Sequence, residues 1–533
     1  MRTAVVFRLA IIVLLALPAT VENLHAETFY VSCDTGDDAN DGVSERHAWK
    51  SASKTARFEF MNGDRILFKR GCVWEDVSIK ITRSVELGAY GDAAALPQLI
   101  AATHVRVWSK PDPRGIVYTF RAIEPGVPSI KEILIVYDAR HSRFYEKVHA
   151  LESLDAPGKF FHDSESNGLH VFPLEGADLQ RDMLISSRPH VLEFQTVNVE
   201  RVVVNGLHLS FANEYAIGFW YQSSGTRNGY LKVVNCLFSG NAYQAIHIGG
   251  TNSFRDVDIV NNTITANGNE GIYIGYIKGS EEGEVVTGML RISGNTIGGL
   301  GFGWRSKGLG SAANGEGIDI KKGVAAAMID HNTIADLTGF YGIGVQSSNA
   351  IIEQNTIRNI HMRDAPPDSG IAGIMVDANE SNGPTVVRGN RVDVRGANGI
   401  AIRGHGDRKP RFEIYDNAIT VEEPYFPIAF TSQNVTNTVI RNNRMRGGRA
   451  GLWVQRPCCP PANVEFHGND VRGVSVPFLA AQDVSAGVRI YGNEFCLKGA
   501  VDAGQKTATP NNTFSNNCAF SNSPVPPQQL QAR

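Results

Sequence analysis

The sequence predicts an all-β solenoid of stacked parallel strands, on three observations. An Asn followed by a small or polar residue and then an apolar one recurs from about residue 200 onward. Short Gly-Ile-x-Ile strands recur between these turns. The turns are spaced by 23 residues (Asn332 to Asn355) up to 37 residues (Asn295 to Asn332), which is typical of one rung per repeat with loops of changing length. The turns begin at Asn235, Asn262, Asn295, Asn332, Asn355, Asn390, Asn417, Asn443, Asn469 and Asn493.

Each rung is predicted to contain two or three short strands and no amphipathic helix. The alternation of a Gly-Ile-x-Ile strand places its two apolar residues inside the solenoid and the residue between them outside. The turn Asn tolerates a left-handed backbone, and its amide can hydrogen-bond to the amide of the next rung. The side chains expected inside are Ile272, Ile274, Ile318, Ile320, Ile343, Ile374, Ile400 and Ile402.

The composition indicates an exported protein of 533 residues. Residues 1–26 read as a signal peptide, with Arg2 and Arg8 before the apolar run Leu9–Leu17 and a cleavage site before Glu27. Removing two Arg and one Glu changes the net charge from -3 to -4, and this balance does not support nucleic acid as the main partner. No later run approaches the ~20 apolar residues of a membrane span. We therefore expect a secreted or periplasmic monomer.

The chain divides into five predicted segments. Residues 1–26 are the signal peptide, and residues 27–100 form an N-terminal cap with the first β-helix strands. Residues 101–190 break the repeat, and their short apolar runs predict a small inserted antiparallel β unit. Residues 191–520 form the main solenoid. Residues 521–533 are predicted to be a disordered tail.

The seven cysteines can form disulfides in an exported protein. Cys33 and Cys72 flank the first segment and Cys496 and Cys518 flank the last, so either pair could bridge an end of the solenoid. The odd count leaves at least one thiol free or intermolecular. No Cys-His spacing suggests a zinc site, and no metal ligands are assigned.

The loop from Asp34 to Gly42 is rich in Asp, Asn and Gly. Its carboxylates could hold Ca²⁺, although the spacing fits no EF-hand. The same residues are common in tight turns, and the turn is the favoured interpretation. No other cofactor is indicated.

The Asn-Thr-Ile turns and Gly-Ile-x-Ile strands over roughly 191–520 resemble the right-handed parallel β-helix (pectate-lyase-like) superfamily. Tyr30-Val31-Ser32 and the run from Gly63 to Phe68 also resemble the entry segment of secreted bacterial members. The resemblance implies the fold and places a saccharide cleft on the sheet of Gly-Ile-x-Ile strands. It does not imply one reaction, because the fold hosts lyases, hydrolases, epimerases and binding proteins.

If these strands stack in register, their outward residues form two columns spaced ~4.8 Å per rung. Glycines beside the columns suggest an open floor. The first column is Gly218, His247, Tyr273, Asp319, Gly344, Met375, Ala401, Ala429 and Trp453. The second column is Trp220, Gly249, Gly275, Lys321, Gln346, Asp377, Arg403, Thr431 and Gln455. The glycines are Gly271, Gly317, Gly342, Gly373 and Gly399.

The long loops 276–286, 298–315 and 361–370 surround the centre of these columns, and long loops on a rigid scaffold often hold binding residues. Trp304, Trp220 and Trp453 are candidates for stacking on sugars, with Tyr273, Gln346 and Asp377 as further binding residues. A solvated loop around Trp304 is the alternative interpretation. Asp377 and Arg403 can equally form an ordinary ion pair across neighbouring rungs.

The preferred functional hypothesis is a polysaccharide lyase acting on an acidic (uronic) polymer by β-elimination. Such an enzyme needs a base for the C5 proton and cations for the substrate carboxylate. Lys321 is the candidate base or clamp, with Asp319 on the same strand and Arg403 and His247 in supporting positions. The alternative for Lys321 is an exposed, solvated side chain.

Two other functions remain open on the sequence. A glycoside hydrolase needs two carboxylates at a defined separation, and Asp319 with Asp377 lies beyond the usual range, although Glu316 could reach Asp319. A non-catalytic polysaccharide-binding or structural component needs only the groove. Strongly shifted pKa values at Lys321, His247 or Asp319 would favour an enzyme.

Overall fold

The computed structural model describes residues 26–105, 108, 118–121, 132–194, 198–219, 227–249, 253–275, 285–301, 315–347, 349–361, 370–378, 383–404, 411–431, 435–455, 461–480, 487–499, 511–515 and 518. The apolar part of the predicted signal peptide and the predicted tail lie outside these residues. Within them, no helix is both long enough and apolar enough to cross a bilayer.

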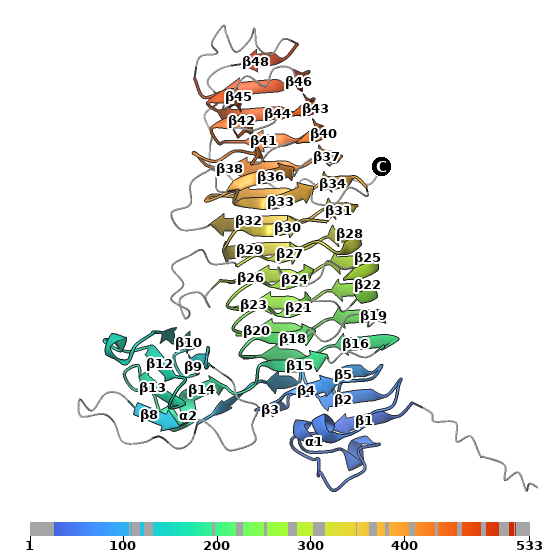
Figure 1. The fold of residues 1–533 in the computed structure, drawn as a ribbon, viewed down its shortest axis with the longest axis vertical. Helices are drawn as coiled ribbons and strands as arrows, with labels where there is room; N and C mark the ends of the chain where they lie inside the picture. The colour runs from blue at the N-terminus through green and yellow to red at the C-terminus, as the bar shows by residue number, and fades with distance from the viewer. Residues whose placement is uncertain are drawn as a thin grey trace, which may run out of the picture.

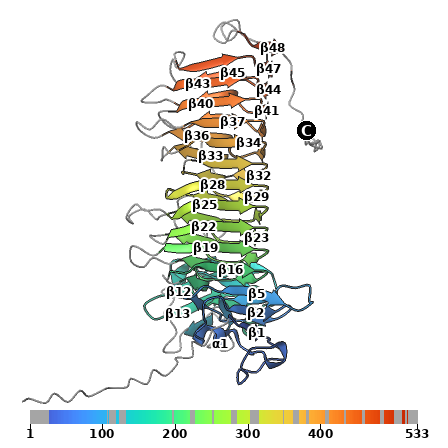
Figure 2. The same ribbon diagram turned by 90° about the vertical axis from the view of Figure 1, so that its right-hand side faces the viewer.

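The chain adopts the right-handed parallel β-helix fold that its turns and strands predict. Figures 1 and 2 show the rungs stacked along one long axis, with three parallel sheets wrapping a shared interior. Successive strands of each sheet come from successive rungs, so each complete coil contributes one strand to every sheet, and the coils at the two ends are incomplete. The β-branched strands are buried because each sheet covers the inner face of the other two.

Sheet C, the sheet of Gly-Ile-x-Ile strands, has 12 strands. They are β4 (Ile79–Ile81), β15 (His190–Phe194), β18 (Tyr215–Phe219), β21 (Ile246–Gly249), β24 (Ile272–Gly275), β27 (Ile318–Ile320), β30 (Tyr341–Val345), β33 (Ala372–Ala378), β36 (Asn398–Gly404), β39 (Ile428–Phe430), β42 (Ala450–Val454) and β45 (Val476–Ala480).

Sheet A follows sheet C in each coil and has 14 strands. They are β1 (Thr28–Val31), β2 (Arg65–Lys69), β5 (Glu86–Tyr90), β16 (Arg201–Asn205), β19 (Arg227–Val234), β22 (Ser253–Val260), β25 (Val286–Ser293), β28 (Val324–Asp330), β31 (Ala350–Glu353), β34 (Thr385–Arg388), β37 (Phe412–Tyr415), β40 (Thr436–Arg441), β43 (Ala462–His467) and β46 (Val488–Tyr491).

Sheet B follows the Asn turn and also has 14 strands. They are β3 (Val73–Trp74), β6 (Gln98–Ile100), β17 (His208–Ser210), β20 (Leu237–Ser239), β23 (Thr263–Thr265), β26 (Thr296–Gly298), β29 (Thr333–Thr338), β32 (Thr356–His361), β35 (Arg391–Val394), β38 (Ala418–Val421), β41 (Arg444–Arg446), β44 (Asp470–Val474), β47 (Glu494–Leu497) and β48 (Thr513–Ser515).

An inserted β unit interrupts the solenoid between β6 and β15 and stands to one side of it in Figure 1. It has two four-stranded sheets and its own small core, which includes Phe160, Leu169 and Met183. Its strands are β7 (Ala102–His104), β8 (Tyr118–Arg121), β9 (Val136–Asp138), β10 (Arg143–Phe144), β11 (Glu146–Lys147), β12 (Lys159–Asp163), β13 (Gly168–Phe172) and β14 (Met183–Ser186).

The helices of the described residues, in the N-terminal segment and in the inserted unit, are short. They are η1 (Glu45–His47), α1 (Ala52–Arg57), η2 (Leu151–Ser153) and α2 (Leu179–Asp182).

The interior of the solenoid is one continuous apolar core. All eight isoleucines expected inside are fully buried, so the prediction of the inward face is confirmed. Each buried Ile or Leu side chain contributes roughly 1.5–3 kcal/mol relative to an exposed one.

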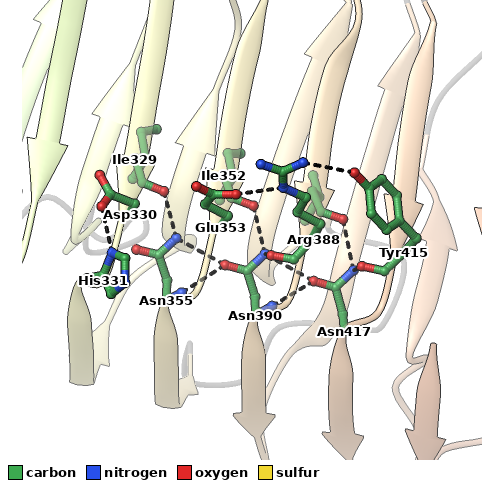
Figure 3. A network of polar contacts seen from close by, with 11 residues as sticks. Ile329, Asp330, His331, Ile352, Glu353, Asn355, Arg388, Asn390, Tyr415 and Asn417 are labelled. Atoms are coloured by element: carbon green, nitrogen blue, oxygen red, sulfur yellow. Dashed lines mark hydrogen bonds and ion pairs between the residues drawn. The ribbon is translucent and has the colours of Figure 1, made fainter. Parts of the chain in front are cut away.

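A ladder of buried Asn side chains runs along the turn between sheets A and B (Figure 3). Each amide donates to the Oδ1 of the next ladder Asn, as in Asn355 to Asn390 at 3.0 Å and Asn390 to Asn417 at 3.0 Å. It also donates to a main-chain carbonyl, as Asn390 does to Ile352 at 2.8 Å. The members of this Asn ladder are Asn262, Asn295, Asn332, Asn355, Asn390, Asn417, Asn443, Asn469, Asn493 and Asn512.

The structure corrects the sequence interpretation of this turn in two respects. The left-handed backbone belongs to the residue before the ladder Asn, such as Asn261 (φ 55°) or Asp416 (φ 57°), because that residue turns the chain while the next one stacks. Asn235 is also left-handed (φ 55°), so it matches Asn261 and not the ladder. The ladder position of its rung is filled by Cys236, a buried free thiol.

The sequence suggested that the glycines of the Gly-Ile steps form an open floor, but they do not. A Cβ on Gly317 would lie 2.7 Å from Cγ2 of Ile334 in sheet B, and one on Gly342 would lie 2.7 Å from Cγ2 of Ile357. These glycines therefore face the interior at the corner between sheets B and C. Any larger side chain there would collide with the core.

Two disulfides close the ends of the described solenoid. Cys33 is bonded to Cys72 with Cα atoms 5.7 Å apart, and Cys496 is bonded to Cys518 with Cα atoms 5.6 Å apart. Both separations lie within the usual range for a disulfide.

Candidate active site

The outward columns of sheet C have the register that the sequence predicts. Tyr273 pairs with Asp319, Asp319 with Gly344, and Gly344 with Met375 along the first column. In the second column, Gly249 pairs with Gly275 and Asp377 with Arg403. Trp220 and Trp304 lie outside the described residues, as do most of the three long loops.

The first column is much less exposed than an open groove requires. Asp319 is 1% exposed and His247 is 4% exposed, and Met375 and Ala401 are completely buried. The side chain of Lys321, in the second column, is 28% exposed, and its Nζ lies 2.7 Å from Oδ2 of Asp319. Lys321 is therefore a partly exposed, ion-paired lysine and not a fully solvated one.

Two glutamates join Asp319 and Lys321 in what we call the carboxylate cluster: Glu270, Glu316, Asp319 and Lys321. Glu270 and Glu316 precede the same Gly-Ile step in neighbouring rungs, and the N–H of Gly271 donates to the carbonyl of Glu316 at 2.9 Å. Their backbones are thus one rung apart. Glu270 is 5% exposed and Glu316 is 4% exposed.

Sequence reasoning missed Glu270 altogether and mentioned Glu316 only as a neighbour of Asp319. The repeated Glu-Gly-Ile of residues 270–272 and 316–318 is the signal that could have found them. Because Gly271 and Ile272 both face the core, the strict alternation of inward and outward residues fails at this step. The residue before the glycine consequently lies on the outer side.

Burial and mutual repulsion make the two glutamates weak acids. Burial, with the neighbouring Asp319 charge, raises the pKa of Glu270 to about 8. Burial, followed by the charges of Glu270 and Asp319, raises the pKa of Glu316 well above its usual value. Like-charged carboxyls in one buried site cannot both ionise readily. At neutral pH the cluster therefore retains a protonated carboxyl group.

Asp319 and Lys321 form an ion pair within the cluster. Burial raises the pKa of Asp319, while the charge and hydrogen bond of Lys321 oppose that rise. Burial alone would lower the pKa of Lys321, but the Asp319 charge and hydrogen bond, followed by Glu316, outweigh it and raise that pKa. Lys321 is therefore kept in its charged form, and a charged lysine is a poor general base.

Several buried polar atoms of the site lack a hydrogen-bond partner among the described residues. They are Oε2 of Glu316, Oδ1 of Asp319, Nδ1 of His247 and Oε1 of Gln244. The Nε2 of Gln244 donates to Oε2 of Glu270. Buried polar groups are rarely left unpaired, so these atoms distinguish the site from the fully paired Asn ladder.

Four aromatic rings extend from the cluster toward the N-terminal rungs, and we call them the ring stack: His190, Tyr215, His247 and Tyr273. Their centroids are 5.4, 4.3 and 4.9 Å apart in that order, and neighbouring planes differ by at most 11°. Burial lowers the pKa of His247 to about 3 and that of His190 to about 4, so both imidazoles are neutral. One face of the Tyr273 ring is covered by His247.

The other predicted residues lie farther along the sheet. The Arg403 guanidinium lies 5.6 Å from the centroid of the Tyr341 ring, beside the cluster. Gln346 is half-buried and its N–H donates to the carbonyl of Ile320 at 2.7 Å. Asp377 is 4% exposed in the rung before Arg403. Trp453 lies five rungs from Asp319 and stacks on Phe426 at 4.7 Å.

The described acidic residues do not form a converging metal site at the cluster. The one described set of three His, Cys, Asp or Glu ligands within 4.8 Å of one another is Cys33, Asp34 and Cys72, and its cysteines are joined in a disulfide. In the loop considered for Ca²⁺, the carboxylate of Asp38 accepts hydrogen bonds from the main-chain N–H groups of Lys50 and Ser51. The carboxylate of Asp34 accepts one from Nζ of Lys69. These bonds are those of a structured turn.

Comparisons with known proteins agree on the architecture. A family model described as a right handed beta helix region matches residues 215–426, which is less than half of the chain. No curated protein matches the sequence. A structure of XylC in complex with xylose has a TM-score of 0.59 at 14% identity, covering 92% of this chain and 86% of that one. At this identity the likeness shows the fold alone.

Two further solved structures are similar at lower TM-scores, and neither carries an argument about this chain. One is a GH136 lacto-N-biosidase from Eubacterium ramulus, with a TM-score of 0.41 at 14% identity over 88% of this chain and 68% of that chain. The other is a mannuronic acid specific polysaccharide family 6 lyase from human gut microbiota. It has a TM-score of 0.48 at 10% identity, covering 92% of this chain and 91% of that chain.

Proposed function

We propose that this protein is an exported glycoside hydrolase whose reacting groups are Glu270, Glu316 and Asp319. The carboxylate cluster supports this proposal more than any other observation. Glycoside hydrolysis requires one carboxyl group that is protonated at working pH and a second that is ionised. The raised pKa of about 8 at Glu270 supports the first requirement, and the ion pair with Lys321, which opposes the rise that burial causes in the pKa of Asp319, supports the second.

In this mechanism, Glu270 or its neighbour Glu316 donates a proton to the glycosidic oxygen as the C–O bond breaks. Asp319 stabilises positive charge on the sugar or activates the water that adds to its anomeric carbon. Water supplies the hydroxyl group at that carbon, and its remaining proton restores the acid. Lys321 positions Asp319 and keeps it ionised. Gln244 holds Glu270 through its amide.

The lyase hypothesis is less well supported by the same geometry. A lyase base must be neutral before it accepts a proton, whereas the pKa of Lys321 is raised. Of the two cations predicted to hold a uronic carboxylate, Lys321 is already engaged by Asp319. An ionised carboxyl group in the cluster also disfavours a further anion beside it. We therefore propose a neutral sugar at the bond that is cleaved.

The alternative of a non-catalytic binder is disfavoured by the electrostatics of the site. Titratable groups with strongly shifted pKa values, brought together in a buried site, are typical of catalysis. A surface that only binds sugars has no need of two buried glutamates. Export remains part of the proposal and is supported by the predicted signal peptide and the two disulfides.

The experiment is a screen of neutral and acidic polysaccharides for two products, with and without Ca²⁺. New reducing ends without ultraviolet-absorbing unsaturated sugars are expected. Asp319→Asn should reduce turnover by about 10²–10⁴-fold, the usual contribution of a positioned acid or base. The matched control is Asp330→Asn, which changes a buried aspartate of sheet A outside the cluster. Unsaturated products, or full activity in Asp319→Asn, would overturn the proposal.

A further inference from the structure

The exposure of sheet C around the carboxylate cluster is informative about which part of a glycan can reach it. Cleavage within a chain requires the chain to cross the site and contact outward residues of several rungs on both sides. Those rungs are spaced by ~4.8 Å. Among the described residues the first column offers no open floor on either side of the cluster, whereas Arg403, Thr431 and Gln455 of the second column are partly exposed.

On the C-terminal side the first column is closed. Met375, Ala401 and Ala429 are completely buried although they point outward from the sheet. Tyr341, Ala372, Met375 and Ala401 form a small apolar cluster on the outer face of sheet C, and Phe340 packs against it. Met375 and Ala401 therefore offer no exposed side chain to a sugar chain that continues along the first column.

On the N-terminal side the ring stack and the inserted β unit fill the surface. His190 is 5% exposed and His247 is 4% exposed. The inserted unit packs Ile135 into an apolar cluster with Ala242, and Tyr137, Phe144, Phe211 and Tyr243 pack against the same cluster. The Tyr243 ring lies 5.9 Å from Tyr215, so this contact adjoins the stack.

Between these two buried parts of the first column, the partly exposed residues Tyr273, Lys321 and Gln346 mark the approach to the cluster. Glu316 and Asp319, each with a buried oxygen that has no described hydrogen-bond partner, belong to that cluster. Gly344 keeps that place open, because a Cβ there would lie 3.4 Å from Oδ1 of Asp319 and 3.0 Å from Cδ2 of Tyr341.

We propose that the site accepts the end of a glycan chain and releases units from that end, which rests on the hydrolase function proposed above. A chain end enters through one opening and needs no second exit along the sheet. Trp453, five rungs away beyond Ala401 and Ala429, then has no role in binding the chain.

The first test follows the mode of cleavage. Xylan, β-glucan, mannan and galactan are each supplied beside their own hexasaccharide, and viscosity and reducing ends are measured together. For the glycan that is hydrolysed, reducing ends should accumulate while viscosity falls slowly, and small products should dominate from the start. A rapid fall in viscosity at few new reducing ends would overturn the proposal but leave the hydrolase intact.

The second test measures binding and does not depend on turnover. Asp319→Asn is titrated with the same polymers, and the number of protein molecules per chain is determined. One protein per chain end is expected, whereas a number that grows with chain length would overturn the proposal. If no glycoside of any length is hydrolysed by the wild type, the proposed function fails separately from this stoichiometry.

One variant gives a control on the distal surface. Gln455→Ala changes a partly exposed residue in the same rung as Trp453. It should leave KM for the polymer and the hexasaccharide unchanged. A rise of threefold or more in KM for the polymer alone, in a folded Gln455→Ala protein, would show that a chain extends along the sheet.

Discussion

The Asn ladder and the carboxylate cluster are both buried polar arrays that pass from rung to rung, yet their hydrogen bonding is opposite. Each ladder amide donates to the next Oδ1 and to a carbonyl, so donors and acceptors are matched along the whole row. Glu270 and Glu316 occupy neighbouring rungs in the same way, but a carboxyl group has no amide N–H to donate to the next rung. Oε2 of Glu316 lacks a partner among the described residues.

The difference shows how one scaffold supports both stability and chemistry. An amide can repeat indefinitely in a parallel stack because it carries its own donor and acceptor. A carboxyl group has a donor only when it is protonated, and burial with the Asp319 charge raises the pKa of Glu270 to about 8. The ladder stabilises the solenoid, and the cluster is left able to exchange protons.

The largest expected effect on stability comes from placing a carboxylate in the ladder. Asn390→Asp removes the amide group that donates to the carbonyl of Ile352 and to Oδ1 of Asn417. These two buried acceptors would then face a carboxylate. We expect a loss of about 3 kcal/mol or more at pH 8, since each unmade buried bond costs ~1–3 kcal/mol. The melting temperature of the variant should recover in part at pH 5, because the new carboxyl group takes up a proton there. Equal melting temperatures for variant and wild type at pH 8 would contradict this account.

Removing the lysine of the cluster tests its role as a positioning residue. Lys321→Met keeps the length of the side chain but breaks the ion pair with Asp319. We expect a loss of roughly 2 kcal/mol, below the 3–5 kcal/mol typical of a fully buried pair because Lys321 is partly exposed. The acidic limb of the pH–rate profile should move to higher pH, because Asp319 loses the charge that keeps it ionised. Lost activity with an unmoved limb would assign Lys321 to direct contact with the reacting atoms.

The pH dependence of the wild type follows from the same raised pKa. The folded pKa of Glu270 is about 8 and lies above its unfolded value, so the folded state prefers the protonated form. Its contribution to stability is therefore greatest below pH ~4.5 and is lost as the pH rises to about 8. Turnover should fall over the same alkaline limb. In Glu270→Gln the alkaline loss of stability should shrink while turnover stays low, which calorimetry and rate measurements across pH 5–9 can check.

The smallest expected effect comes from extending the ladder by one rung. Cys236 occupies the ladder position before Asn262, and its Sγ lies 3.7 Å from the carbonyl oxygen of Val204. In Cys236→Asn the new amide can donate to that carbonyl and to Asn262. A gain of ~0.5–1.5 kcal/mol is expected, the net contribution of a typical hydrogen bond. Cys236→Ala is the matched control, and an Asn variant no more stable than the Ala variant would show that the ladder ends here for steric reasons.

The sequence by itself determined the solenoid, its register and the inward face. The Asn turns fixed the start of each rung, and the period-two alternation fixed that Asp319, Tyr273 and His247 lie in one outward column. These properties depend on local backbone geometry and on the burial of Ile side chains, both of which are readable along the chain.

The tertiary structure alone decided how deep the site lies and which groups share it. Alternation assigns a face to Met375 or Lys321, but it cannot say what packs over that face, because the covering residues come from other rungs. Glu270 was missed because two successive inward residues break the alternation after it. The raised pKa values arise from carboxyls that are 46 residues apart in sequence at Glu270 and Glu316 yet one rung apart in space, and distance in space sets both their repulsion and their loss of solvent.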